Sequence, residues 1–273
     1  MRKILIATWL AALSAAPALA EGEKNFKTPQ LAVKAFSQAL VKKDQNGMRA
    51  IFGPRLKGLL ASEERDEAMR VLGRVIQEHW SLAPTEEGGR ILRLGAEGWP
   101  FPVPLAKGPA GWHFDTTSGL EEILNRRVGH NELLTISTLH RLIAAEKAYQ
   151  AREKTYATRI LSTPGKHDGL YWKSTSKTDR SPLENALGHA FKYAEGHVEG
   201  APWFGYRYQI RPGPGFEVIA YPVNYGKSGV MSFVCNQEGV IYQKDLGAKT
   251  YNVIKTLESF APDDSWTQVN EKQ

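Results

Sequence analysis

Cysteine is almost absent from this sequence of 273 residues, because Cys235 is the only one. A single cysteine cannot form a disulfide within the chain, so the fold must be stabilised by packing, even in an oxidising compartment. Met231, Phe233 and Cys235 alternate along an apolar stretch, which places them on one face of a predicted strand. A buried, inert thiol is the expected role, and a nucleophilic cysteine is the alternative.

Long apolar runs are missing everywhere except at the start of the chain. Residues 1–3 are basic at two positions, residues 4–16 are almost entirely apolar, and residues 17–20 read Pro-Ala-Leu-Ala. This pattern is typical of a secretory signal peptide, and we expect cleavage after Ala20 and a periplasmic or secreted product. No cysteine follows the cleavage site, so we expect no lipid anchor. The mature chain has no second long apolar run, so we expect no transmembrane segment in it.

A strong excess of one charge is also absent. Removing Arg2 and Lys3 lowers the formal net charge from +6 to +4, and the basic residues are spread along the chain. Such a mild excess gives weak attraction to anionic surfaces and does not favour a nucleic-acid partner.

The residue spacings in this sequence do not match those of known catalytic and metal-binding motifs. Gly226-Lys227-Ser228 resembles the end of a phosphate-binding loop, but Tyr221 stands where that loop requires its first glycine. The histidines show no H-E-x-x-H spacing, and Glu132 falls on a different helical face from His140. We therefore expect no catalytic constellation, no metal and no cofactor.

Apolar periodicity and turn residues predict an α+β fold. The first half combines helices with a small strand meander: helices at residues 28–43, 48–52 and 63–79, then strands at 90–94, 99–105 and 111–115. Prolines alternate with apolar residues in the second strand, which favours an edge strand or a polyproline-like ribbon. Trp99, Phe101, Trp112 and Phe114 are expected to share a face, either as core or as an aromatic platform for a glycan.

A long central helix is predicted to join the two halves. Residues 119–127 form a short helix with Arg126 and Arg127 in its last turn, and Gly129 is its expected left-handed stop. Asn131 then caps a long helix that reaches residue 152, with its buried stripe marked by Leu139, Leu142, Ile143 and Tyr149.

The second half ends in a predicted four-stranded antiparallel sheet. A capping box at residues 181–184 begins a helix that ends near 196, and a short helix at residues 250–260 finishes the chain. The strands between them form a meander with turn-rich connections, at residues 206–211, 216–222, 229–235 and 240–244. The predicted organisation is a signal peptide at 1–20, an N-terminal α+β domain at 21–128 and a C-terminal α+β domain at 129–273.

Several of these stretches, taken in order, resemble the bacterial exported family catalogued as domain of unknown function 2950. The stretches that carry the resemblance are residues 99–105, 112–115, 122–127, 131–133, 165–172, 181–183, 225–231 and 244–247. The resemblance spans nearly the whole mature chain and implies export, but it implies no activity, substrate or catalytic residue. Two likenesses concern fold alone: residues 28–115 are similar to the nuclear-transport-factor-2-like class, and residues 131–247 to the head of pilins, without a pilin stem.

Three functional hypotheses follow. The first is a non-enzymatic binding or assembly factor of the periplasm or envelope, whose partner is an unknown envelope protein or cell-wall component. The second is an envelope hydrolase or ligand-processing enzyme, which requires distant residues to converge on one pocket. Its candidate ligand-binding residues are Arg126, Arg127, Asn131, Glu132, His167, Asp168, Tyr171 and Trp172. The third is a glycan-binding module at Trp99 and Trp112. His167 and Asp168 are acid and base candidates in a loop, although Asp168-Gly169 is also a typical turn.

Overall fold

A computed structural model describes residues 23–56, 65–176, 178–187, 200–212, 215–257, 259–260 and 262–270. The predicted signal peptide lies outside these residues, as does the predicted end of a helix near residue 196. The chain divides into two compact units, Met1–Ile123 and Leu124–Gln273. Each described unit combines helices with an antiparallel sheet, which confirms the α+β class.

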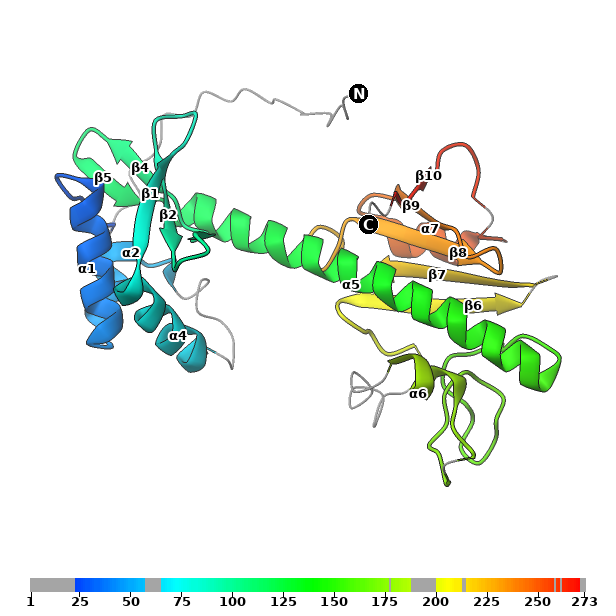
Figure 1. The fold of residues 1–273 in the computed structure, drawn as a ribbon. Coiled ribbons are helices and arrows are strands. Elements are labelled where there is room, and N and C mark those ends of the chain that lie inside the picture. Colours follow the sequence, from blue (N-terminus) through cyan, green and yellow to red (C-terminus); the bar gives the residue numbers. More distant parts are fainter. Residues whose placement is uncertain are drawn as a thin grey trace. The chain divides into compact units, whose positions relative to one another are not determined.

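The first unit packs helices against a small sheet. Its helices are α1 (Pro29–Val41), α2 (Gln45–Phe52) and α4 (Arg65–Glu78), and its strands are β1 (Trp80–Pro84), β2 (Arg90–Leu94), β3 (Trp99–Pro100), β4 (Leu105–Gly108) and β5 (Gly111–Phe114). The strand order is β1-β2-β4-β5, and β3 pairs with β2. Figure 1 shows the helices of this unit beside its small sheet. Thr28 caps α1 as predicted, because its side chain accepts a hydrogen bond from the Leu31 amide. The strand β1 was not predicted.

Proline limits the predicted strand at residues 99–105 to its two ends, Trp99–Pro100 in β3 and Leu105 in β4. Pro100, Pro102 and Pro104 have no amide hydrogen, so only scattered backbone bonds remain, such as Phe101 N to Leu92 O at 2.8 Å. Phe101 and Phe114 are buried against Phe36 and Phe52, with ring centroids 5.0–6.4 Å apart. These two aromatic residues therefore belong to the core.

The two predicted central helices form one continuous helix, α5 (Thr116–Glu153). Asp115 caps it by accepting hydrogen bonds from the amide and the hydroxyl of Ser118, at 3.0 and 2.7 Å. Gly129 does not have a positive φ, and a Cβ atom there would meet nothing within 4 Å. The predicted stop at Gly129 is therefore wrong, and Arg126 and Arg127 lie inside a helix rather than in its last turn.

The second unit is built on a five-stranded sheet. Its elements after α5 are α6 (Pro182–Leu187), β6 (Tyr206–Pro212), β7 (Phe216–Pro222), β8 (Met231–Asn236), β9 (Ile241–Asp245), α7 (Thr250–Thr256) and β10 (Thr267–Gln268). The order is β10-β9-β8-β7-β6, so the predicted four-stranded meander is present and gains one short strand.

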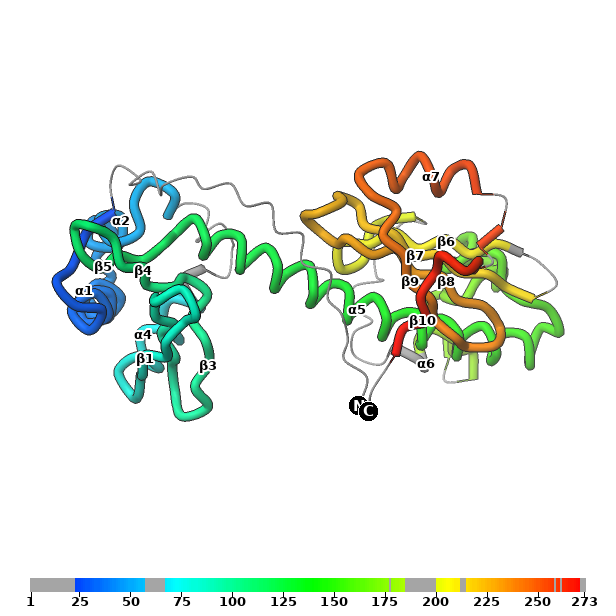
Figure 2. The backbone as a smooth tube through the Cα atoms, turned by 90° about the horizontal axis from the view of Figure 1, so that it is seen from above, coloured from blue at the N-terminus to red at the C-terminus, as the bar shows by residue number. Residues whose placement is uncertain are grey.

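Both faces of this sheet are covered. Phe233 and Cys235 pack into the cluster that contains Leu139 and Leu142 of α5. Val234 belongs to a second cluster with Ile219 and with Ile254 of α7, and Figure 2 shows α5 and α7 on opposite sides of the strands. Cys235 is buried as predicted. Its neighbours in β8 on the opposite face of the sheet are buried too, because α7 covers that face.

Among the described helices, none combines the length and the apolar character that a membrane crossing requires.

Candidate functional site

Asn131 and Glu132 of α5 hold the start of β8. One Glu132 oxygen accepts hydrogen bonds from the amides of Val230 and Met231, at 2.8 and 3.0 Å. The Asn131 side-chain amide donates to the Ser228 carbonyl at 2.9 Å. Two of the stretches that carry the family resemblance, about a hundred residues apart, therefore meet at this joint between α5 and β8.

Two glycines and a buried tyrosine complete this joint. A Cβ atom on Gly229 would lie 2.0 Å from the Tyr206 hydroxyl, and one on Gly205 would lie 2.8 Å from Ser228 and 2.9 Å from the Asn131 amide. Tyr206 donates to the Met231 carbonyl at 2.9 Å, and burial, followed by the charge of Glu132, raises the pKa of its phenol. The phenol therefore stays protonated, and the joint stabilises the fold.

Asp168 closes its own loop. The Thr163 amide and hydroxyl donate to its two oxygens, both at 2.7 Å. The hydrogen bond from the Thr163 hydroxyl is the main reason that the pKa of Asp168 is lowered. The hydrogen-bonded turn of this loop lies at Pro164-Gly165, where the Lys166 amide donates to the Thr163 carbonyl at 2.9 Å, whereas Asp168 and Gly169 do not form such a turn.

His167 faces a different way and joins a cation–aromatic cluster, which we define as Arg152, His167, Trp172 and Asp179. The His167 ring stacks on Trp172 with centroids 4.1 Å apart and planes at 19°, and the Arg152 guanidinium lies 4.4 Å from the Trp172 ring. Trp172 is only 6% exposed, so it serves as a rigid support. The His167 side chain is 47% exposed and the Arg152 side chain 38%, so both the imidazole and the guanidinium reach solvent.

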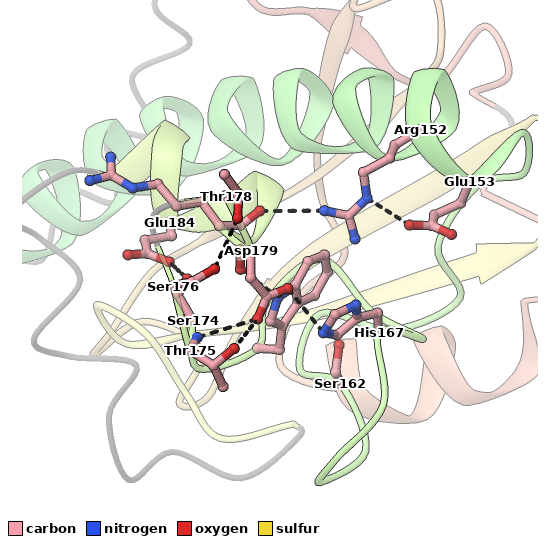
Figure 3. A network of polar contacts seen from close by, with 12 residues as sticks. Arg152, Glu153, Ser162, His167, Ser174, Thr175, Ser176, Thr178, Asp179 and Glu184 are labelled. Carbon is pink, nitrogen blue, oxygen red and sulfur yellow. Dashed lines mark hydrogen bonds and ion pairs between the residues drawn. The ribbon is translucent and has the colours of Figure 1, made fainter.

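Asp179 connects this cluster to the following loop (Figure 3). Its backbone carbonyl and Oδ1 accept from the Trp172 indole N–H at 3.0 and 3.2 Å, and Oδ1 lies 3.4 Å from His167 Nε2. Oδ2 accepts from the hydroxyl and amide of Thr175, and the hydroxyl bond is the main cause of the lowered pKa of Asp179. The carboxylate is therefore ionised and keeps the cluster in place.

The predicted site residues lie in two places rather than in one pocket. Glu132 lies at the joint with β8, whereas the Tyr149 hydroxyl donates to the His167 carbonyl at 2.9 Å. Glu132 and Tyr149 are separated by 17 residues of α5, which is about 25 Å of helix. Tyr171 pairs with Leu161 beside the second place. Side chains cannot span this distance, so the single pocket that the hydrolase hypothesis requires is not formed.

The aromatic pair in the first unit is also divided. Trp99 is 48% exposed and pairs with Leu94 at one end of β2. Trp112 is partly buried and lies 5.5 Å from the guanidinium of Arg90, at the other end of β2. These ends lie four positions apart along β2, about 13 Å, so the two indoles do not form one continuous aromatic platform.

Sequence reasoning missed three residues of the second unit: Glu146, Arg152 and Asp179. Glu146 follows Leu142 by four residues on α5, so helical spacing alone indicates its burial. The signal for Arg152 was its position in the last turn of α5. Asp179 had no signal, because its role depends on contacts with His167 and Trp172 that only the folded loop creates. Within the described residues, no group of three or more His, Cys, Asp or Glu side chains is placed to hold a metal ion.

A family model described as "Protein of unknown function (DUF2950)" matches residues 23–215 and 211–269 of the chain. No curated protein and no solved structure matches the chain. The likenesses to the nuclear-transport-factor-2-like class and to pilin heads therefore stay predictions.

Proposed function

The chain belongs to the DUF2950 family, and we propose that it is a non-enzymatic binding factor of the periplasm or envelope that uses the cation–aromatic cluster to recognise an anionic group. Export rests on the signal-peptide pattern of residues 1–20. Membership of the DUF2950 family does not depend on this proposal.

The observation that carries the proposal is an exposed guanidinium and an exposed imidazole that are both ordered on a buried indole. Stacking on Trp172 reduces the rotamer freedom of Arg152 and His167, so less entropy is lost when a ligand binds. The described bonds of Arg152 use Nε, to Glu153 at 2.6 Å, and Nη1, to the Arg180 carbonyl at 3.5 Å. Its Nη2 group remains for a carboxylate or phosphate, which guanidinium groups bind through paired hydrogen bonds.

The surrounding sequence has the charge that such a ligand requires. Residues 152–184 contain seven Lys or Arg and four Asp or Glu. Carboxylate- or phosphate-bearing polymers are the anionic ligands of a bacterial envelope that fit this excess. Binding is favoured over hydrolysis because His167 faces Trp172 and Asp179 while Asp168 faces Thr163, so the two do not form an acid–base pair.

The test measures binding of the chain from residue 21 to isolated anionic cell-wall polymers, with a neutral glycan as reference. Arg152→Ala should weaken binding about tenfold or more, the size of one lost charge-assisted contact. Lys173→Ala is the charge-matched control, since Lys173 is exposed and follows Trp172 directly, and it should change affinity less than about threefold. Equal losses in the two variants, or no saturable binding, would contradict the proposal.

A separate experiment on cells that produce the full-length chain tests export. Protein recovered from the envelope fraction of the producing cell should begin at Glu21 by mass spectrometry. A chain that still begins at Met1 in that fraction would contradict export with cleavage after Ala20.

A further inference from the structure

Glu146 is a fully buried carboxyl group with one unpaired oxygen. It lies on α5 with 0% exposure, beside the apolar cluster that contains Leu142 and Tyr149. Oε2 accepts a hydrogen bond from the Ala157 amide at 3.0 Å, whereas Oε1 has no hydrogen-bond partner among the residues that the structure describes. A buried polar atom without a partner is costly, so its retention calls for a physical reason.

The hydrogen bond to Ala157 holds a return segment, which we define as residues 154–161. Lys154 has a φ of 61°, which ends α5 and turns the chain back along it. Ala157 and Ile160 are then buried in the same cluster as Tyr149, so the segment docks on the helix that it has just left.

The return segment is the base of the loop that carries the cation–aromatic cluster. Tyr171 N donates to the Ile160 carbonyl at 2.8 Å, and Leu170 N to the Arg159 carbonyl at 3.2 Å. Trp172 follows this pair of bonds directly, and His167 precedes it by three residues. A displacement of residues 157–161 therefore changes the support of both side chains.

The surroundings of Glu146 do not neutralise its charge. Among the described residues with a resolved pKa shift, its charge acts on the Cys235 thiol of β8 and the Tyr149 phenol of α5, and neither is a cation. Burial raises the pKa of Glu146 from its ordinary value of 4.5 to about 7, against the opposing effect of the Ala157 amide. Ionisation near neutral pH then leaves a buried negative charge that water can stabilise only if the segment opens.

We propose that the Glu146 carboxyl and the Ala157 amide form a proton-controlled latch, which holds the return segment closed when Glu146 is neutral and loosens it when Glu146 is ionised. Its consequence for ligand binding rests on the proposed function, because the cluster above it is the proposed binding site. The latch itself is a property of the unliganded protein.

Amide hydrogen exchange at Ala157, Leu170 and Tyr171 tests the latch without a ligand. An open-state pKa of 4.5 and a closed-state pKa of about 7 require the opening equilibrium to increase about tenfold between pH 6 and pH 8. In Glu146→Gln, which keeps an acceptor for the Ala157 amide, opening should not change over this range once intrinsic exchange chemistry is subtracted. Glu238→Gln, an exposed residue after β8, is the matched control and should behave like the parent chain. Identical pH profiles for the parent and Glu146→Gln would overturn the latch.

A second measurement needs no variant. The ¹³C shift of the Glu146 side-chain carboxyl should titrate with a midpoint near 7, and a midpoint near 4.5 would also overturn the latch. A latch that opens as expected, together with a lack of anion binding by the parent chain, would remove the proposed function and leave the latch intact.

Discussion

Glu132, one of the predicted site residues, connects α5 to the start of β8. One of its oxygens serves two backbone amides at the start of β8. Glu132→Ala should lower the free energy of unfolding by about 2–4 kcal/mol, because two partly buried N–H groups lose their acceptor. Chemical denaturation monitored by far-UV circular dichroism measures this loss.

Two further variants separate the acceptor from the charge. Glu132→Gln retains an oxygen for both amides and should cost less than about half of the alanine effect. Glu121→Ala removes an exposed glutamate from the same helix and should stay within about 0.5 kcal/mol of the parent. If Glu132→Ala were as stable as Glu121→Ala, the joint between α5 and β8 would not stabilise the protein.

The role of a side chain was predictable where it depends on the neighbouring residues in the sequence. The burial of Cys235 followed from alternation along its strand, and burial also raises the pKa of the thiol, which keeps it unreactive. The hydrogen bonds of Glu132 were not predictable, because its partners lie almost a hundred residues away. The separate orientations of His167 and Asp168 depend on Trp172 and Thr163, and sequence adjacency does not reveal them.

Gly129 lies inside the continuous helix α5. The sequence indicates a helix stop there, whereas α5 continues through it without a positive φ and with open space at the Cβ position. Gly129→Ala should therefore raise the free energy of unfolding by about 0.5–1 kcal/mol, because alanine is the better helix former. Thermal unfolding measures the change.

Gly226 supplies the matched control for that substitution. A Cβ atom at Gly226 also meets nothing within 4 Å, but the residue has a φ of 71°. Gly226→Ala should lower the free energy of unfolding by about 1 kcal/mol, the cost of a left-handed alanine. A loss of stability in Gly129→Ala would show that the helix does stop there.

Helices and strands were predictable from the sequence where a clear apolar periodicity is bounded by capping or turn residues. Thr28 and Pro29 mark the start of α1, and the glycine-containing connections mark the strands from β6 to β9. The strand β10 was missed because two residues carry no periodicity. The strand β1 was missed because it begins two positions after the end of α4 and contains Ala83 and Pro84, which do not favour strands. Gly129 was misread because composition does not reveal the φ that tertiary packing selects.

At the scale of the whole molecule, the described chain contains hydrophobic clusters that do not share residues between the two units. Phe36 belongs to the cluster of the first unit, and Leu142 and Ile254 belong to clusters of the second. Since each unit buries its own core, calorimetry should resolve two unfolding transitions. Phe36→Ala removes a fully buried ring and should lower one transition by about 10 °C or more, from a loss of about 3–5 kcal/mol. Leu142→Ala is the reciprocal variant and should lower the other transition, whereas equal shifts of both transitions in both variants would contradict independent cores.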